Sequence, residues 1–310
     1  MIAAPMSACL WFLLSLQTPQ ATAPAAPAAA PAYVPQRVYD TSRQGFADFE
    51  TMLADLAKAD VVFVGEQHDD SNTHRLEAAI LDGLRRRGVP VIVSLEMFER
   101  DAQPLLSAYL AGKTTEEEFL KSSRPWPRYA TDYRALVEMA KGERWPVIAS
   151  NVPRKYASEV AKAGKGALDA LPASERALAA KDLVCSEDAY FARFAENMGK
   201  HPMPGSEKLT AEDKRAQTER YYYSQCVKDE TMAESIAREF AQVGRGPLVH
   251  VNGAFHSDFG QGTVERARRR LEGRRIAVVS ILPIDGKEID TVAPSAEDLR
   301  RADYLVYTTK

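Results

Sequence analysis

The chain has 310 residues, with 40 Lys and Arg against 43 Asp and Glu, which gives a formal net charge of −3. Its 45% hydrophobic and 27% charged residues exclude a fibrous, collagenous or wholly disordered protein. Nucleic-acid binding needs a basic face that neutralises phosphates, so the near-neutral balance excludes that class as well. The one basic cluster, Arg266–Arg270, is interpreted as the solvated face of a helix.

The first 36 residues carry no charge at all. An apolar run at residues 9–16, CLWFLLSL, precedes an Ala- and Pro-rich stretch, which is typical of a secretory signal followed by a spacer. The run is far shorter than the roughly 20 residues that span a bilayer as a helix. We therefore expect residues 1–36 to be a signal peptide and spacer, and the protein to be exported. A lipid anchor at Cys9 is less favoured, because the apolar run follows this cysteine instead of preceding it.

Two cysteines, Cys185 and Cys226, remain once the signal is removed. In an oxidising compartment an even number of cysteines is compatible with a disulfide. Two small buried side chains on helices explain the same residues equally well, so both interpretations stay open.

From residue 37 onward, β-branched apolar runs alternate with amphipathic stretches, which is the signature of βαβ units and a mainly parallel sheet. A helix is expected after the first run, because apolar residues recur at helical spacing from Leu76 to Leu84 before Gly88. Between residues 153 and 244 the strand signal disappears and helices are expected, with a break at His201–Gly205. Strands are predicted at residues 61–64, 91–95, 146–150, 248–251 and 276–282.

These patterns predict an α/β fold with a mainly parallel sheet sandwiched by helices and a smaller inserted all-helical subdomain. The α/β domain is assigned to residues 37–152 and 245–310. The helical subdomain is assigned to residues 153–244.

Polar side chains follow four of the predicted strands. Glu66 and His68 come after the first, Glu96 after the second, Asn151 after the third and His256 after the fourth. Ligands of open parallel sheets bind at the carboxyl ends of the strands, so these groups are expected to share one edge. Two carboxylates and two imidazoles can bind a divalent metal or act as acid and base.

Each of these residues also has a purely structural interpretation. Glu66 can cap the next helix, Glu96 can pair with Arg100, and Asn151 can cap the helix that opens at Pro153. His250 lies inside an apolar run and is interpreted as a core histidine. The coincidence of four polar strand ends favours the functional interpretation.

Five segments resemble the ChaN-like haem-binding uptake proteins, which belong to a wider group with erythromycin-esterase-like enzymes and the Tiki and TraB proteins. These segments are Gly65–Asp69 (GEQHD), Ser94–Arg100 (SLEMFER), Ala149–Arg154 (ASNVPR), Asp229–Ala233 (DETMA) and Asn252–His256 (NGAFH). The resemblance covers roughly residues 37–285. It implies an α/β sandwich with a smaller helical domain, export to the bacterial periplasm or outer membrane, and a role in haem or iron acquisition.

The resemblance also implies a homodimer that holds haem, with a tyrosine on the iron and a histidine near the propionates, and an outer-membrane haem receptor as a partner. No motif fixes the tyrosine. Tyr221 and Tyr223 are candidates, whereas Tyr222 lies on the apolar stripe of its helix; Tyr190, His201 and Met203 are further possibilities. The residues expected to contact haem are His68, Tyr221, Tyr223, Asn151, Arg154 and His256.

Two functions remain open from the sequence. The first is haem binding for uptake. The second is a hydrolase or peptidase, with or without a divalent metal, in which Glu66, His68, Glu96 and His256 carry the chemistry or hold the ion.

Overall fold

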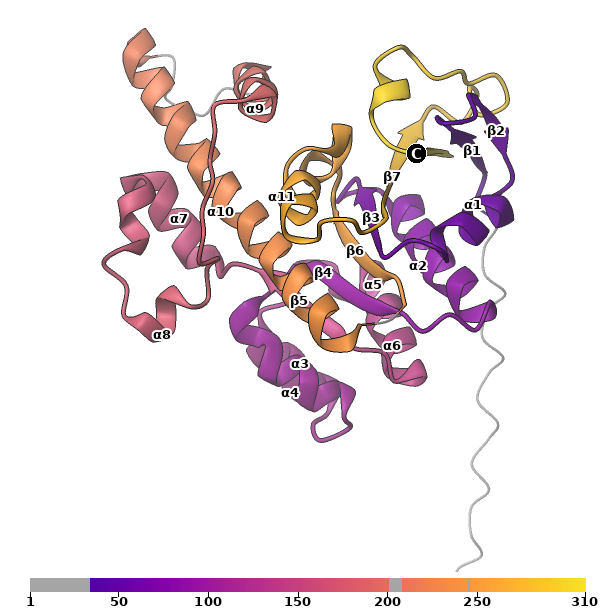
Figure 1. Ribbon diagram of the computed structural model, residues 1–310, viewed down its shortest axis with the longest axis horizontal. Helices are drawn as coiled ribbons and strands as arrows, with labels where there is room; N and C mark the ends of the chain where they lie inside the picture. The colour runs from indigo at the N-terminus through magenta and orange to yellow at the C-terminus, as the bar shows by residue number, and fades with distance from the viewer. Residues whose placement is uncertain (1–33, 201–207, 245) are drawn as a thin grey trace, which may run out of the picture. The chain divides into compact units, whose positions relative to one another are not determined.

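Eight strands form one sheet in the computed structural model, which describes residues 34–200, 208–244 and 246–310 (Figure 1). The strands are β1 Gln36–Asp40, β2 Gly45–Ala47, β3 Val61–Glu66, β4 Ile92–Glu99, β5 Val147–Asn151, β6 Leu248–Gly253, β7 Ile276–Ile284 and β8 Tyr304–Thr309. Their order across the sheet is β2-β1-β8-β7-β3-β6-β4-β5. The strands from β8 to β5 are mutually parallel, and β1 joins β8 and β2 antiparallel. All five predicted strands are present; β1, β2 and β8 were not predicted.

The central strand β3 shows why the parallel strands appear in the sequence as continuous apolar runs. Val62 and Val64 face one hydrophobic core, and Val61 and Phe63 face another on the opposite side. Because helices cover both faces, every residue of β3 is buried, as is usual in parallel sheets.

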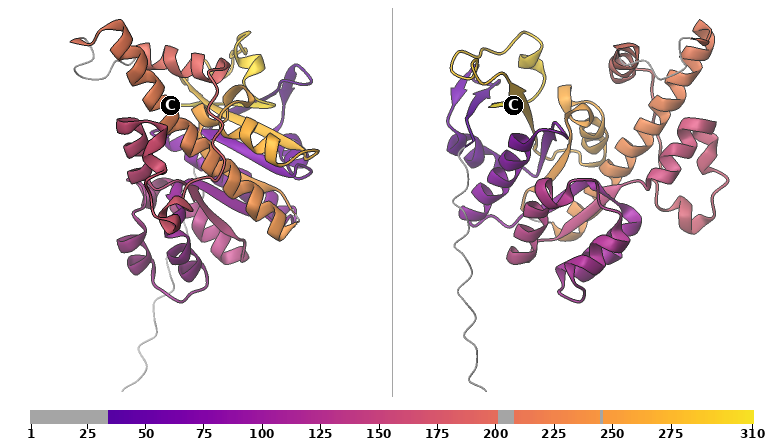
Figure 2. Two further views of the ribbon diagram at one scale, coloured as in Figure 1. Left: turned by 60° about the vertical axis from the view of Figure 1, so that its left-hand side comes forward. Right: turned by 180° about the vertical axis from the view of Figure 1, so that it is seen from behind.

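Helices cover both faces of the sheet, so the predicted α/β sandwich is confirmed (Figure 2). One face packs against α1 Phe49–Leu56, α2 Ser71–Arg86, α3 Gln103–Leu110, α4 Glu116–Ser123, α5 Tyr129–Asp132 and α6 Arg134–Glu143. The other face packs against α10 Ala211–Val243 and α11 Thr263–Arg270.

Helix α2 illustrates how the sequence sets these elements. The Asp70 carboxylate accepts a hydrogen bond from the Thr73 backbone N–H and caps the helix N-terminus. The expected apolar side chains from Leu76 to Leu84 are buried against the sheet. The helix ends just before Gly88, whose positive φ of 67° suits a residue without Cβ.

The described chain between β5 and β6 contains helices only, as predicted: α7 Arg154–Ala163, α8 Ala173–Arg176, α9 Ala189–Lys200 and α10. Helices α7 and α9 pack against α10, and the C-terminal half of α10 packs on the sheet through Ala233, Ile236 and Phe240 (Figure 1). Val34–Lys310 forms one compact unit, and the division into two domains stays a prediction. The expected break at His201–Gly205 lies outside the described residues, as does residue 9 with its proposed lipid anchor. None of the described helices is long and apolar enough to cross a membrane.

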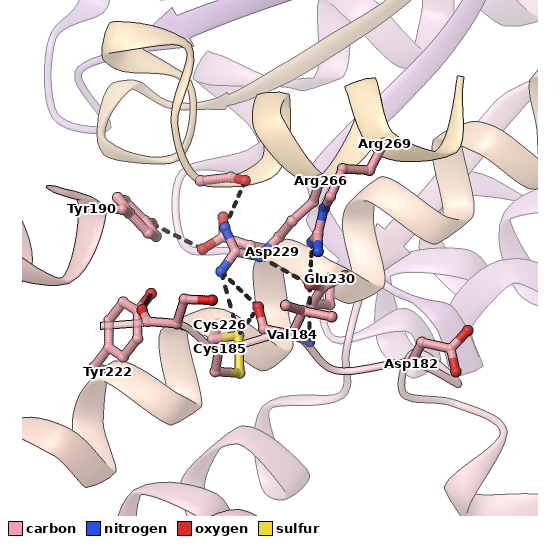
Figure 3. The surroundings of a disulfide bond; sticks show 12 residues. Asp182, Val184, Cys185, Tyr190, Tyr222, Cys226, Asp229, Glu230, Arg266 and Arg269 are labelled. Carbon is pink, nitrogen blue, oxygen red and sulfur yellow. Dashed lines mark hydrogen bonds and ion pairs between the residues drawn. A yellow bond between two sulfur atoms is a disulfide. The ribbon is translucent and has the colours of Figure 1, made fainter. Parts of the chain in front are cut away.

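Cys185 and Cys226 form a disulfide, which decides between the two interpretations of these residues (Figure 3). The bond ties the segment before α9 to the middle of α10. It closes a loop with a sequence separation of 41 residues.

The interpretation of Arg266–Arg270 as a solvated helix face is wrong for part of this cluster: Arg268 and Arg269 are exposed, but Arg266 is fully buried. Arg266 and Arg269 approach the buried Glu230 at 3.3 and 2.6 Å (Figure 3), and Arg270 approaches it at 2.6 Å. A carboxylate buried on α10 needs cationic partners, and α11 supplies them.

Candidate functional site: a polar pocket at the carboxyl edge of the sheet

A pocket of about 1030 Å³ opens where β3, β4 and β6 end. Glu66, His68, Glu96 and His256 all line it. The structure therefore brings together the four residues that the sequence placed at separate strand ends. This follows from the topology, because β6 lies between β3 and β4 and all three run in parallel.

Glu66 and His68 form the first half of the pocket floor. The His68 Nδ1 atom lies 2.5 Å from Glu66 Oε1, which also accepts a hydrogen bond of 2.8 Å from the Tyr133 hydroxyl. Glu66 is buried, whereas the His68 side chain is 48% exposed. With the proton on Nδ1 shared with Glu66, the Nε2 lone pair of neutral His68 is free to bind a ligand.

Glu96 and His256 form the second half, and the buried Asp229 lies behind His256. His256 Nδ1 lies 2.7 Å from Asp229 Oδ1, and His256 Nε2 lies 3.3 Å from Glu96 Oε1. Asp229 is in turn held by the hydroxyls of Thr263 at 2.8 Å and Tyr190 at 2.9 Å. Both ring nitrogens of His256 therefore face a carboxylate, and the ring is fixed in orientation.

Gly253 at the end of β6 joins the two halves. Its backbone N–H donates a hydrogen bond of 2.8 Å to Glu96 Oε2. A Cβ at this position would lie 2.6 Å from His68 Nε2 and 3.7 Å from Glu96 Oε2. Since 2.6 Å is far inside van der Waals contact, only glycine allows the His68 ring to lie over the strand end.

Burial and neighbouring charges set the ionisation of the floor. Burial opposes charge on His256, but Glu96 and Asp229 outweigh it and raise the pKa of His256 to about 10. Burial also opposes charge on Glu96, yet His256 and His68 lower the pKa of Glu96 well below its ordinary value. The pKa of His68 is raised, because Glu66 and Glu96 outweigh the effect of its burial. The floor therefore contains ionised carboxylates and a protonated His256 at neutral pH.

The remaining expected haem contacts divide into two groups. Arg154 lines the pocket. Asn151 is buried, donates from its amide to the Glu96 carbonyl and does not line the pocket. Tyr221 and Tyr223 do not line it either; Tyr223 packs beside α7 and under Lys165. His201 and Met203 lie outside the described residues.

The structural alternatives from the sequence are also settled. Arg100 pairs with Glu234 at 2.9 Å instead of Glu96. Asp70, not Glu66, caps α2, and Asn151 does not cap α7. His250 is a core histidine as expected, since burial lowers its pKa to about 3 and the Ser94 hydroxyl contacts its Nδ1. Tyr222 is buried, also as expected.

The pocket wall carries cations and aromatic rings that the sequence analysis did not single out. Arg154, Lys228 and Arg300 line it, and none of the three forms an ion pair with another described residue. Trp126 and Phe259 add flat apolar surfaces. The remaining lining cations are Arg193, which also packs over Phe255, together with Lys200 and Arg301.

Asp229 is the residue beside the pocket floor for which sequence reasoning gave no role, whereas the close approach at Gly253 was expected of a glycine at a strand end. Asp229 lies in a segment that carried the family resemblance, and that was the signal available. Its contact with His256 depends on the packing of α10 against the end of β6, which spacing along the chain does not reveal.

This is the fold and site of an α/β protein with a charged, histidine-containing pocket at the carboxyl edge of a parallel sheet. Residues 52–267 match the model of the family described as haem-binding uptake, Tiki superfamily, ChaN. The chain belongs to this family, as the sequence resemblance indicated.

Several solved structures are similar to this chain. ChaN of Campylobacter jejuni, described with cofacially bound haem, has 18% identity and a TM-score of 0.66, over 89% of this chain and 97% of that chain. A succinoglycan biosynthesis protein has 11% identity and a TM-score of 0.50, over 84% of this chain and 90% of that chain. An erythromycin esterase has 13% identity and a TM-score of 0.43, over 88% of this chain and 83% of that chain. None of the curated proteins matches.

Proposed function

We propose that this protein binds haem for uptake and holds it in the pocket at the carboxyl edge of the sheet. The main observation behind this proposal is the accessibility of the His68 ring in the pocket. Among the described histidines its side chain alone is accessible, at 48%, whereas His74, His250 and His256 are buried. Its Nδ1 is tied to Glu66, as the second ring nitrogen of an iron-binding imidazole usually is.

The rest of the pocket suits the other parts of haem. Two propionates need cations, and Arg154, Lys228 and Arg300 have no ion-pair partner among the described residues. A porphyrin ring needs flat apolar walls, which Trp126 and Phe259 provide. A pocket of about 1030 Å³ lies at the upper end of the usual size of ligand sites.

His68 is preferred over Tyr221 and Tyr223 as the iron ligand, because neither tyrosine lines the pocket. Family membership supports haem as the cargo. Export is supported by the uncharged first segment and by the Cys185–Cys226 disulfide, since disulfides persist in oxidising compartments. The homodimer and the outer-membrane receptor stay predictions.

Titration of the purified protein with haemin and with iron-free protoporphyrin tests this function. We expect a saturable Soret shift with haemin and weaker binding of protoporphyrin, since protoporphyrin keeps the propionates and the ring but lacks the iron. Equal affinity for both would show that His68 does not ligate iron. Absence of any shift would contradict haem binding altogether.

A second candidate function is hydrolysis, favoured by the Asp229–His256–Glu96 arrangement. With a pKa of about 10, His256 is a cation that can stabilise a developing oxyanion and is a poor general base. His68 or Glu66 would then be the base. A panel of ester and peptide substrates tests this, and activity unchanged in Glu66→Gln and His256→Gln variants would exclude these residues as catalysts.

A further inference from the structure

Behind the pocket floor, a second group of ionisable side chains lies inside the protein. His74 and Glu77, three residues apart on α2, face Glu66 at the end of β3. All three are buried, and neither His74 nor Glu77 lines the pocket. The proposed function therefore leaves His74 and Glu77 without a role.

The spacing of their polar atoms matches a metal-binding site. His74 Nδ1 lies 3.5 Å from Glu66 Oε2 and 3.3 Å from Glu77 Oε2. One ligand atom from each residue lies within 4.8 Å of the others. Tetrahedral zinc with bonds of about 2.0–2.2 Å has ligand atoms roughly 3.3–3.6 Å apart. The imidazole is thus separated from each carboxylate as two ligands of one ion would be, and the two carboxylates lie within 4.8 Å of one another.

Two buried oxygens in this group lack a hydrogen-bond donor. Glu66 Oε2 and Glu77 Oε1 have no hydrogen-bond partner within the described parts of the chain. A buried carboxylate oxygen without a donor is costly. A divalent cation would balance the two carboxylates and bind these oxygens.

Neighbouring residues orient the His74 ring, as the outer contacts of a metal site usually orient its histidine ligands. His74 Nε2 lies 3.3 Å from the His68 carbonyl and 3.4 Å from Asp132 Oδ2, so its N–H can donate outward while Nδ1 faces inward. Asp132 is fixed by Arg128 at 2.6 Å. Metal-bound imidazoles usually donate their second N–H to a carboxylate or carbonyl in this way.

We propose that Glu66, His74 and Glu77 form a buried site for a divalent cation of the zinc type, behind the pocket in which haem is proposed to bind. One nitrogen and two carboxylate oxygens are ligands that zinc accepts, and a fourth position remains for water. The site is distinct from the set Glu66, His68, Glu96 and His256 that the sequence suggested for a metal. It shares Glu66 with that set and places the ion on the other side of this carboxylate.

Zinc binding by the full-length, chelator-stripped protein tests the proposal without haemin present. In competition with a chromophoric chelator we expect one zinc per chain and an affinity at least 100-fold lower in Glu77→Gln. Glutamine keeps the shape of Glu77, so this variant is expected to fold. The matched control is Glu96→Gln, which removes a buried carboxylate from the pocket floor and is expected to bind zinc as the wild type does.

Three results would overturn the proposal: no zinc bound by the wild type, binding unchanged in Glu77→Gln, or binding lost in Glu96→Gln. If circular dichroism shows that Glu77→Gln is unfolded, His74→Gln takes its place. X-ray absorption of the zinc-loaded wild type gives an answer that needs no variant. A spectrum that shows one imidazole and oxygen ligands around zinc supports the buried site. A spectrum that shows two imidazoles would place the ion at His68 and His256 instead.

Discussion

Replacing Gly253 by alanine tests how the pocket floor is assembled. The backbone of Gly253, at φ −55° and ψ 132°, is open to alanine, so the substitution adds no backbone strain. Its effect comes from the new Cβ, which would lie 2.6 Å from His68 Nε2 and 2.7 Å from His68 Cε1. Ordinary contact begins at 3.4 Å, so the His68 ring must move.

The expected magnitude follows from that movement. A shift of roughly 1 Å stretches the 2.5 Å contact between His68 and Glu66 to the limit of hydrogen bonding. A hydrogen bond to a charged group contributes about 1.5–3 kcal/mol, and loss of such a partner weakens binding at a metal about 10- to 100-fold. We therefore expect Gly253→Ala to lower haemin affinity by about 10- to 100-fold.

The assay is a haemin titration followed by the Soret band, with the His68 ring titrated by NMR in the same variant. Because the Glu66 contact raises the pKa of His68, we expect this pKa to fall in Gly253→Ala. The matched control is Gly142→Ala in α6, where no atom lies within 4 Å of the added Cβ. Wild-type haemin affinity together with an unchanged His68 pKa in Gly253→Ala would show that the His68 ring does not depend on a glycine at this position.

Three further predictions concern stability and the pocket wall. Replacing Cys185 and Cys226 by serine should lower the free energy of unfolding by about 4 kcal/mol, from the closure of a loop with a sequence separation of 41; a loss below about 1 kcal/mol in urea unfolding would contradict this. The pKa of His256 is about 10 against an ordinary 6.5, so its stabilisation is complete below pH 6.5 and is lost as pH rises toward 10. We expect the free energy of unfolding of His256→Gln to decline less steeply over this pH range than that of the wild type. An equal decline in the variant and the wild type would contradict the stabilising role of charged His256. Replacing Arg154 and Arg300 by alanine should weaken haemin binding several-fold and reduce its salt dependence, and equal salt dependence in variant and wild type would exclude ion pairs with the propionates.

The parallel part of the sheet was predictable because both of its faces are covered. A strand such as Val61–Glu66 is buried throughout and therefore stands out as an apolar run. Strand β1 and the edge strand β2 are partly exposed, and their three- to five-residue lengths give a weak signal. Strand β8 combines tyrosines and threonines with two aliphatic residues, and the sequence analysis passed over it.

The pocket floor was predictable to the extent that it lies at strand ends. Glu66, His68, Glu96 and His256 were expected at one edge, and they line one pocket. Asp229 was not assigned a role, because it reaches His256 from the middle of a long helix whose packing is a tertiary property. The same limit explains Arg266, which is buried against Glu230 and Cys226 of α10.

Haemin titration of the wild type, His68→Ala and the Tyr221→Phe/Tyr223→Phe double variant gives the sharpest test of iron ligation by His68. We expect a saturable Soret shift in the wild type and in the tyrosine variant, and its loss or displacement in His68→Ala. This outcome follows from the placement of His68 in the pocket and of both tyrosines outside it. A wild-type spectrum in His68→Ala, together with loss of the shift in the tyrosine variant, would show that a tyrosine and not His68 binds the iron.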